Sequence, residues 1–169
     1  MAKRTPLGTA GKGRRGIGVV GWALRGAAAG AAGTTALNAA TYLDMAVRGR
    51  GASPTPEQTV AKVASKAGVS LGEGEKRENR LQGLGPLTGL AAGVGMGVLV
   101  GLLRAAGLRS QPVVGTALIT AGVMAAANGP MVVMAITDPR SWSATDWISD
   151  VVPHLAYGAV VKTTMDALG

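Results

Sequence analysis

Four long apolar stretches, separated by short polar segments, dominate the pattern of this chain. They cover residues 22–47, 84–103, 112–137 and 147–168. Each is about as long as, or longer than, the roughly 20 residues that a helix needs to cross the hydrocarbon core of a bilayer. The pattern therefore predicts an all-α protein, an integral membrane bundle of about four glycine- and alanine-rich transmembrane helices. We expect residues 16–169 to form one transmembrane helical domain.

Aromatic residues stand near both ends of the first stretch. Trp22 and Tyr42 are twenty positions apart, which is about 30 Å along a helix and matches the thickness of the hydrocarbon core. We interpret them as interfacial anchors and expect Arg25 to snorkel towards the headgroups. A secretory signal peptide is the rival interpretation, because basic residues precede an apolar run with small residues. The length of the run and the polar Thr34 and Thr35 argue against cleavage.

Polar segments flank the first stretch on both sides. Residues 1–15 are basic and glycine-rich and contain no acidic residue, which predicts a disordered tail. The segment 48–80 predicts a polar loop that carries a short amphipathic helix, with Thr55 as its N-cap in a capping box. The apolar face of this helix is predicted to consist of Val60, Val63 and Ala67.

Glycine recurs at every fourth position of the second apolar stretch. We call these residues the glycine ladder: Gly85, Gly89, Gly93, Gly97 and Gly101. The spacing places them on one helix face, where a partner backbone can approach closely. The partner is either another helix of the same chain, which we favour for a protein with four spans, or a second copy of the protein.

Prolines interrupt the last two stretches. Pro130 predicts a kink near Asn128, because proline removes a helix hydrogen bond. Pro153 lies in the apolar centre of the last stretch, which leaves a re-entrant or surface helix as the alternative there. Ser143 and Asp146 have the spacing of a capping box and predict the start of this helix.

The charge of the chain raises the question of nucleic acid. The net charge is +8, but the basic residues lie in the tail and between the apolar stretches, where a membrane surface favours them. Aromatic residues make up only 3% of the chain, so side chains that could stack on bases are scarce. We therefore expect no nucleic-acid partner. The expected partners are the lipid bilayer and another membrane protein or a second copy of the chain.

Motifs for chemistry are few. Gly16-x-Gly18-x-x-Gly21 matches the dinucleotide fingerprint, but no strand precedes it and the chain has 27 glycines, so chance explains the match. One histidine and no cysteine leave no familiar zinc arrangement. We expect no cofactor, no metal site and no catalytic residue.

Polar residues within the apolar stretches form the candidate site: Asn38, Asn128, Asp150 and His154. With four spans, three of them lie at comparable depth and Asp150 lies one turn nearer the surface. Such residues mark either a proton or ion path or hydrogen bonds that fix the packing of helices. We favour the second interpretation.

Four spans place both termini on one side of the membrane. Lys and Arg divide almost evenly between the two sides, so they decide little. The acid-free tail and the short basic turn Arg104–Arg109 favour termini in the cytoplasm of a bacterial inner membrane.

Several segments resemble small multi-pass membrane proteins of high-GC bacteria. They are Ala36-Leu37-Asn38 with Tyr42-Leu43-Asp44, Gly83-Leu84-Gly85-Pro86, Asn128-Gly129-Pro130, and Pro153-His154-Leu155-Ala156-Tyr157. The resemblance implies membrane topology and carries no activity. We expect a non-enzymatic structural or accessory membrane subunit. The alternative is a small oligomeric proton- or cation-linked transporter or channel, and a lipid-modifying enzyme comes third.

Overall fold

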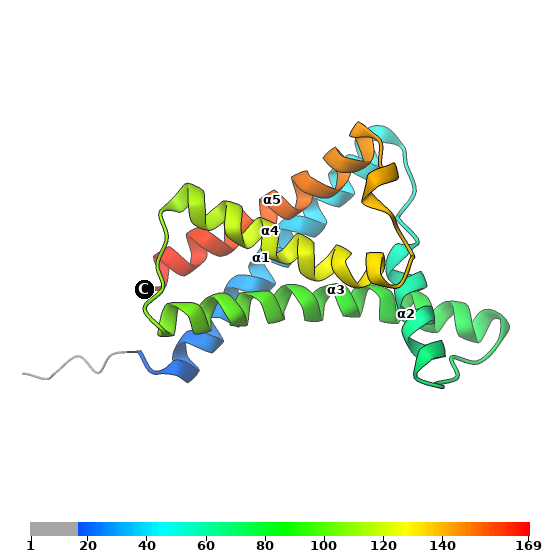
Figure 1. Cartoon of the computed structure of the whole chain (residues 1–169), viewed down its shortest axis with the longest axis horizontal. Helices are drawn as coiled ribbons and strands as arrows, with labels where there is room; N and C mark the ends of the chain where they lie inside the picture. Colours follow the sequence, from blue (N-terminus) through cyan, green and yellow to red (C-terminus); the bar gives the residue numbers. More distant parts are fainter. Residues whose placement is uncertain (1–16) are drawn as a thin grey trace, which may run out of the picture.

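The computed structural model describes residues 17–169, and this range contains helices and no strand. The helices are α1 (Val19–Arg48), α2 (Thr55–Lys66), α3 (Gly74–Ala105), α4 (Pro112–Val133) and α5 (Ala144–Ala167), with a short 3-10 helix, η1 (Pro139–Ser141) (Figure 1). The prediction of an all-α helical bundle is confirmed. The predicted disordered tail, residues 1–15, lies outside the described residues.

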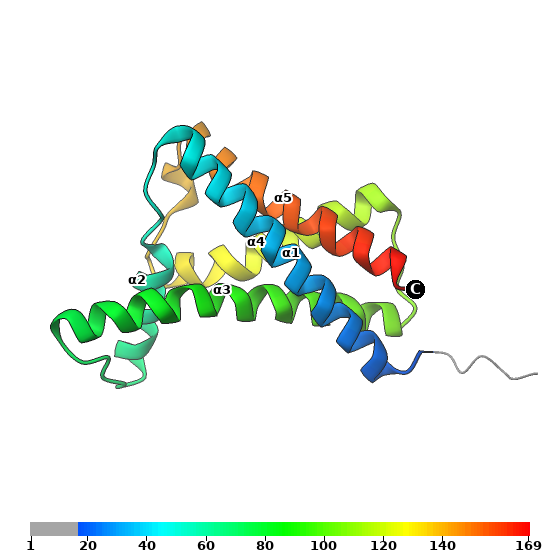
Figure 2. The same ribbon diagram turned by 180° about the vertical axis from the view of Figure 1, so that it is seen from behind.

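The four long helices run between two ends of the molecule. α1 crosses α3 and packs along α5, which runs in the opposite direction, while α4 packs against α5 and α2 against the first part of α3 (Figures 1 and 2). We call one end, with residues 19–25, 104–112 and 162–169, the terminal end. The opposite end, with residues 44–80 and 133–150, is the loop end.

The buried core lies between α1, α4 and α5. Tyr157, Val161 and Met165 of this helix are fully buried. The other buried residues of the core come from α1 and α4: Trp22, Ala29, Ile119 and Val123. α5 is continuous despite Pro153, and its predicted capping box is confirmed, with reciprocal hydrogen bonds between Ser143 and Asp146. The least regular apolar stretch of the sequence is therefore the helix that contributes the most residues to this core.

The structure corrects two expectations in the polar segment 48–80. The first concerns residues 74–80, which we expected to belong to the polar loop. They are helical, because α3 begins at Gly74 and the Glu, Lys and Arg residues of this segment are strong helix formers. α2 begins at Thr55 after Pro54, without a side-chain cap. Its buried residues are Val60 and Ala64, whereas Val63 is 51% exposed. The predicted cap of α2 is therefore wrong. The predicted apolar face is confirmed at Val60 and wrong at Val63 and Ala67, because the face that packs is set by the position of α3.

The third apolar stretch ends earlier than predicted. α4 ends at Val133, because Ala135 adopts a left-handed conformation with φ of 53°. The Ala135 N–H donates to the Val132 carbonyl at 2.9 Å, and the Ile136 N–H donates to the Met131 carbonyl at 2.8 Å. These two bonds form a Schellman motif, which closes the helix four residues before the predicted limit.

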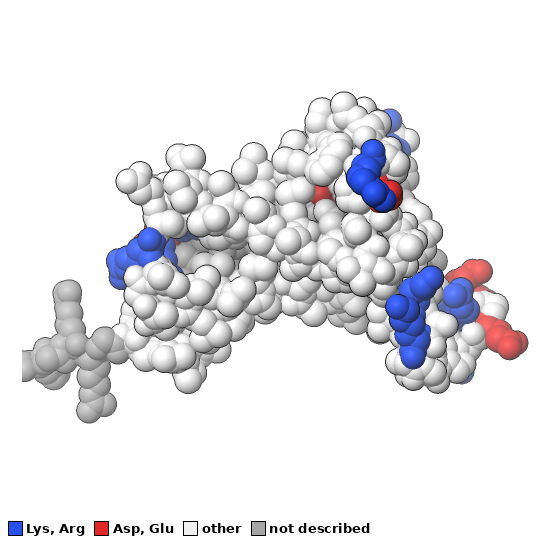
Figure 3. Space-filling model, in the orientation of Figure 1, with Lys and Arg blue, Asp and Glu red and all other residues white. Residues whose placement is uncertain are grey.

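Charged residues gather at the two ends of the molecule. The chain has no Asp, Glu, Lys or Arg at residues 26–43, 81–103, 110–137 and 151–161. Figure 3 shows the corresponding white band between the coloured ends. Large apolar side chains are exposed within it, as at Leu118, which is 65% exposed. Within residues 17–169, two helices, α3 and α4, are long and apolar enough to cross a membrane.

Candidate functional site

Three of the four predicted polar residues come together between α4 and α5. The Asn128 Nδ2 amide donates to Asp150 Oδ2 at 2.8 Å. His154 Nδ1 lies 2.6 Å from the Asp150 backbone oxygen and 3.5 Å from Asp150 Oδ1. The side chains of Asp150 and His154 are 19% and 11% exposed. One turn of α5 therefore presents a carboxylate and an imidazole to an amide of α4.

Asn38 stands apart from this cluster. It lies on α1, is half-buried and makes no side-chain hydrogen bond to any residue in the range 17–169. The sequence could indicate only that Asn38 lies at a depth similar to that of the other polar residues. It could not indicate whether Asn38 lies beside Asp150, and the two side chains share no hydrogen bond in the described range. The candidate site of the folded chain is therefore Asn128, Asp150 and His154, which we call the polar cluster.

The chemistry of the polar cluster follows from its donors and acceptors. A backbone carbonyl can only accept, so His154 Nδ1 carries a proton and donates to the Asp150 carbonyl. Nε2 is then the nitrogen that can accept a proton. The Asp150 carboxylate is bound by the Asn128 amide, so the cluster joins α4 to α5. No group of His, Asp or Glu in the described part of the chain is arranged to hold a metal ion.

The glycine ladder is divided between two partners. Gly93, Gly97 and Gly101 are buried, and a Cβ atom on Gly97 would lie 2.5 Å from Gly30 Cα on α1. Gly85 lies against α2, where a Cβ atom would be 3.3 Å from the Glu57 nitrogen. Gly89 has no neighbour within 4 Å. The regularly spaced glycines therefore differ in their partners. Gly93, Gly97 and Gly101 contact α1, Gly85 contacts α2, and Gly89 contacts neither helix.

The face of α1 that packs against the glycine ladder was not predicted from the sequence. Gly26 and Gly30 meet the ladder backbone to backbone: a Cβ atom on Gly30 would lie 2.6 Å from the Gly93 carbonyl oxygen. Gly33 meets α5 instead, where a Cβ atom would lie 2.6 Å from Val161 Cγ2. The signal was present as Gly26-x-x-x-Gly30, the spacing typical of close helix contacts.

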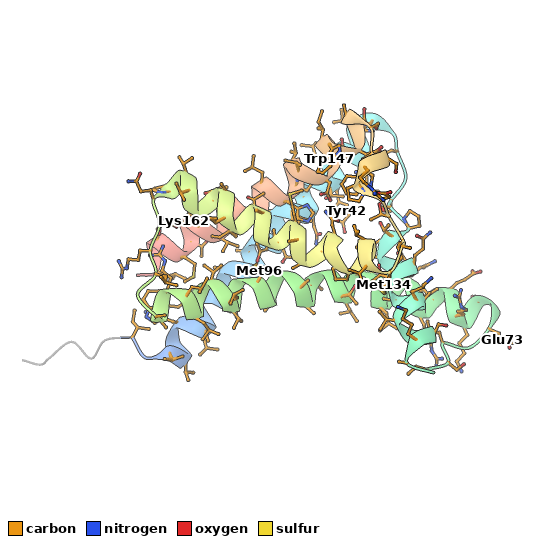
Figure 4. The ribbon with its side chains drawn as sticks, viewed as in Figure 1. Tyr42, Glu73, Met96, Met134, Trp147 and Lys162 are labelled. Carbon is orange, nitrogen blue, oxygen red and sulfur yellow. The ribbon has the colours of Figure 1, made fainter. Side chains whose placement is uncertain are left out.

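The two predicted aromatic anchors have different surroundings. Trp22 is only 7% exposed and belongs to the core, with the Arg25 guanidinium 5.5 Å from its ring centroid. Tyr42 is 63% exposed at the loop end, where Figure 4 also places Trp147. Trp147 packs edge-on against Trp142 with a centroid distance of 5.0 Å. Exposed aromatic rings are therefore found at the loop end, while Trp22 serves packing at the terminal end.

No protein family matches the chain, and no curated protein and no solved structure is significantly similar to it.

Proposed function

We propose that this chain is a multi-pass membrane protein whose helices α1, α3, α4 and α5 cross the bilayer, and that it is a structural or accessory subunit of a bacterial inner membrane. The observation that carries the proposal is the uncharged band between the two charged ends. Leu99 of α3 is 47% exposed and Leu118 of α4 is 65% exposed within that band. Contiguous apolar surface of this kind is uncommon on soluble monomers, whereas lipid accommodates it without cost.

The uncharged segments of α1 and α5 differ in length. The uncharged part of α1, residues 26–43, is about 27 Å long, close to the thickness of the hydrocarbon core. The uncharged part of α5, residues 151–161, is only about 16 Å long. Asp150 and Lys162, which bound it, are both paired with neighbouring side chains, and paired polar groups are the kind that membrane interiors tolerate. The rings of Tyr42 and Trp147 at the loop end suit a headgroup region.

The contacts of the polar residues favour a structural role. Asn128 and Asp150 satisfy each other across α4 and α5. The ladder residues Gly93, Gly97 and Gly101 pack against α1 within the chain. An ion path needs polar groups that are free to exchange partners, whereas these groups hold helices together. We propose that the exposed loop end, including α2, offers a surface to another membrane protein.

Cysteine accessibility tests the membrane proposal. The chain has no cysteine, so single-cysteine variants can be labelled without background. Ser70→Cys at the loop end and Ser110→Cys at the terminal end are exposed positions, and Leu118→Cys lies in the uncharged band. In sealed vesicles, a membrane-impermeant maleimide should label Ser70→Cys and Ser110→Cys from opposite sides and should leave Leu118→Cys unmodified. Labelling of all three from one side, or release of the protein by alkaline carbonate, contradicts the proposal.

A proton- or cation-linked transporter is the second candidate. The observation that favours it is the placement of the His154 imidazole 3.5 Å from the Asp150 carboxylate between α4 and α5. Flux into liposomes should be compared for the parent chain, His154→Ala and Asp150→Asn, with Tyr42→Phe as a control outside the polar cluster. Transport predicts that only the first two substitutions reduce flux. Equal flux in all four proteins removes this candidate.

A further inference from the structure

Basic side chains converge at the terminal end. The described cations there are Arg25, Arg104, Arg109 and Lys162, and they come from α1, α3, the α3–α4 turn and α5. Among residues 17–169, Asp166 is the only acidic residue at this end. Figure 3 shows basic side chains reaching the surface there. We call these four residues the cationic cluster.

The two buried members of the cationic cluster, Arg104 and Lys162, pair with a single carboxylate. Asp166 accepts from both Lys162 Nζ and Arg104 Nη2. The Lys162 and Arg104 side chains are only 5% and 8% exposed. Two buried cations therefore share one carboxylate. Excess charge of this kind is stabilised when a further anion is bound.

The remaining two cations stand beside the same end of α5. Arg109 Nη2 donates a long hydrogen bond of 3.4 Å to the backbone oxygen of Gly169. Arg25 lies against the Trp22 ring, and its Nη1 atom is buried without a hydrogen-bond partner in the described part of the chain. A guanidinium has five donors in a planar fork, which suits the oxygens of a phosphate. Both arginines therefore have donors left for an anion.

An apolar groove adjoins the cationic cluster. It has a volume of about 350 Å³ and is lined by Pro112, Val113, Thr116, Ala117 and Leu155. The groove begins three residues after Arg109 and lies on the α4–α5 seam. The same seam holds Lys162, because a Cβ atom on Gly115 would lie 2.8 Å from Lys162 Cδ. Figure 4 shows Lys162 beside these two helices. The cationic cluster therefore lies at the terminal end, and the apolar groove lies next to it in the direction of the uncharged band.

We propose that the terminal end binds an anionic phospholipid, with its phosphate at the cationic cluster and an acyl chain in the groove lined by Val113, Ala117 and Leu155. Charge complementarity selects this occupant: basic pockets between membrane helices bind lipid phosphates, and the groove supplies the apolar contact that free phosphate does not need. The proposal rests on the proposed membrane location.

Lipid titration of the purified full-length protein in neutral detergent tests the proposal. Phosphatidylglycerol should raise the unfolding temperature and remain bound in native mass spectrometry, whereas phosphatidylcholine should do so only at much higher concentration. Arg109→Gln should weaken apparent phosphatidylglycerol affinity about fivefold, the effect expected of one basic residue near a lipid surface. Arg140→Gln is the matched control, because Arg140 is 90% exposed at the loop end and pairs with Asp138. Equal effects of the two lipids, or of the two substitutions, overturn the proposal.

A second arm separates lipid from free phosphate. Ala117→Phe should fill the groove and weaken phosphatidylglycerol retention, while Ala125→Phe, at another exposed position of the same helix, should leave it unchanged. Inorganic phosphate or glycerol 3-phosphate should give no comparable stabilisation. If inorganic phosphate alone reproduces the full effect, the site is for a soluble anion and the lipid proposal is wrong. Because membrane insertion is measured separately by cysteine labelling, its failure is distinguishable from failure of lipid selectivity.

Discussion

The phenolic hydroxyl of Tyr157 on α5 donates a 2.6 Å hydrogen bond to the backbone carbonyl oxygen of Gly93 on α3. Tyr157 is fully buried, and its ring lies against Gly33 of α1, where a Cβ atom would be 2.8 Å from Tyr157 Cδ2. Thr34 of α1 also lies against Gly93. Three helices therefore meet at one ring, and two glycines make the room for it.

Removal of the Tyr157 hydroxyl should destabilise the bundle while its packing is kept. Tyr157→Phe is expected to reduce the free energy of unfolding by about 1 kcal/mol, or by about 0.6 kcal/mol if the bundle is measured in lipid. Tyr42→Phe, at an exposed position, is the matched control and should change little. Thermal unfolding of both variants in the same detergent makes the comparison. Equal stability of Tyr157→Phe and the parent would mean that the bond to Gly93 contributes nothing.

Alanine at two positions of the glycine ladder should have opposite effects on stability. A Cβ atom on Gly97 would lie 2.6 Å from the Gly30 nitrogen, so Gly97→Ala must push α1 and α3 apart; overpacking typically costs about 1–3 kcal/mol. Gly89→Ala meets nothing within 4 Å and should stabilise the helix by up to about 1 kcal/mol. Chemical unfolding of both variants provides the measurement. Destabilisation by Gly89→Ala as large as that by Gly97→Ala would indicate that Gly89 contacts a second molecule.

Glycine at position 135 should stabilise the end of α4. Ala135 has φ of 53°, a conformation that costs a residue with a Cβ atom about 1–2 kcal/mol and costs glycine much less. Ala135→Gly is therefore expected to raise the unfolding temperature. Ala125→Gly, in the interior of the same helix, should lower the stability by about 1 kcal/mol. A loss of stability in both variants would argue against the left-handed cap.

The start of α5 should depend on pH in the acid range. Hydrogen bonds from Ser143 to the Asp146 carboxylate hold the pKa of Asp146 below its ordinary value of 3.8. Because the folded-state pKa is the lower one, the contribution of Asp146 to stability is present above pH 3.8 and is lost as the pH falls through the folded-state pKa. The difference in unfolding temperature between the parent and Asp146→Ala should therefore narrow in acid. Thr145→Ala, which removes no ionisable group, should show no such narrowing.

Part of the candidate site could be predicted from the sequence. Asp150 and His154 are four residues apart on one helix, so their proximity follows from helix geometry alone. The bond from Asn128 to Asp150 and the separation of Asn38 could not be predicted, because they depend on how α4 and α1 rotate and cross against α5. The depth of a residue along the bundle indicates which layer it occupies, but it does not indicate which residues of that layer are in contact with it.

The amino-acid sequence alone predicts the helical class, the uncharged stretches and the capping box of Ser143, since each depends on residues close together in the chain. The contacts of Gly97 with Gly30, and of Gly85 with α2, depend on how the folded helices cross, as does the absence of a neighbour within 4 Å of Gly89. The sharing of Asp166 by Arg104 and Lys162 likewise depends on the packing of α3 against α5. The physical reason is that periodic spacing assigns residues to a face of a helix, whereas crossing geometry decides which other helix that face contacts.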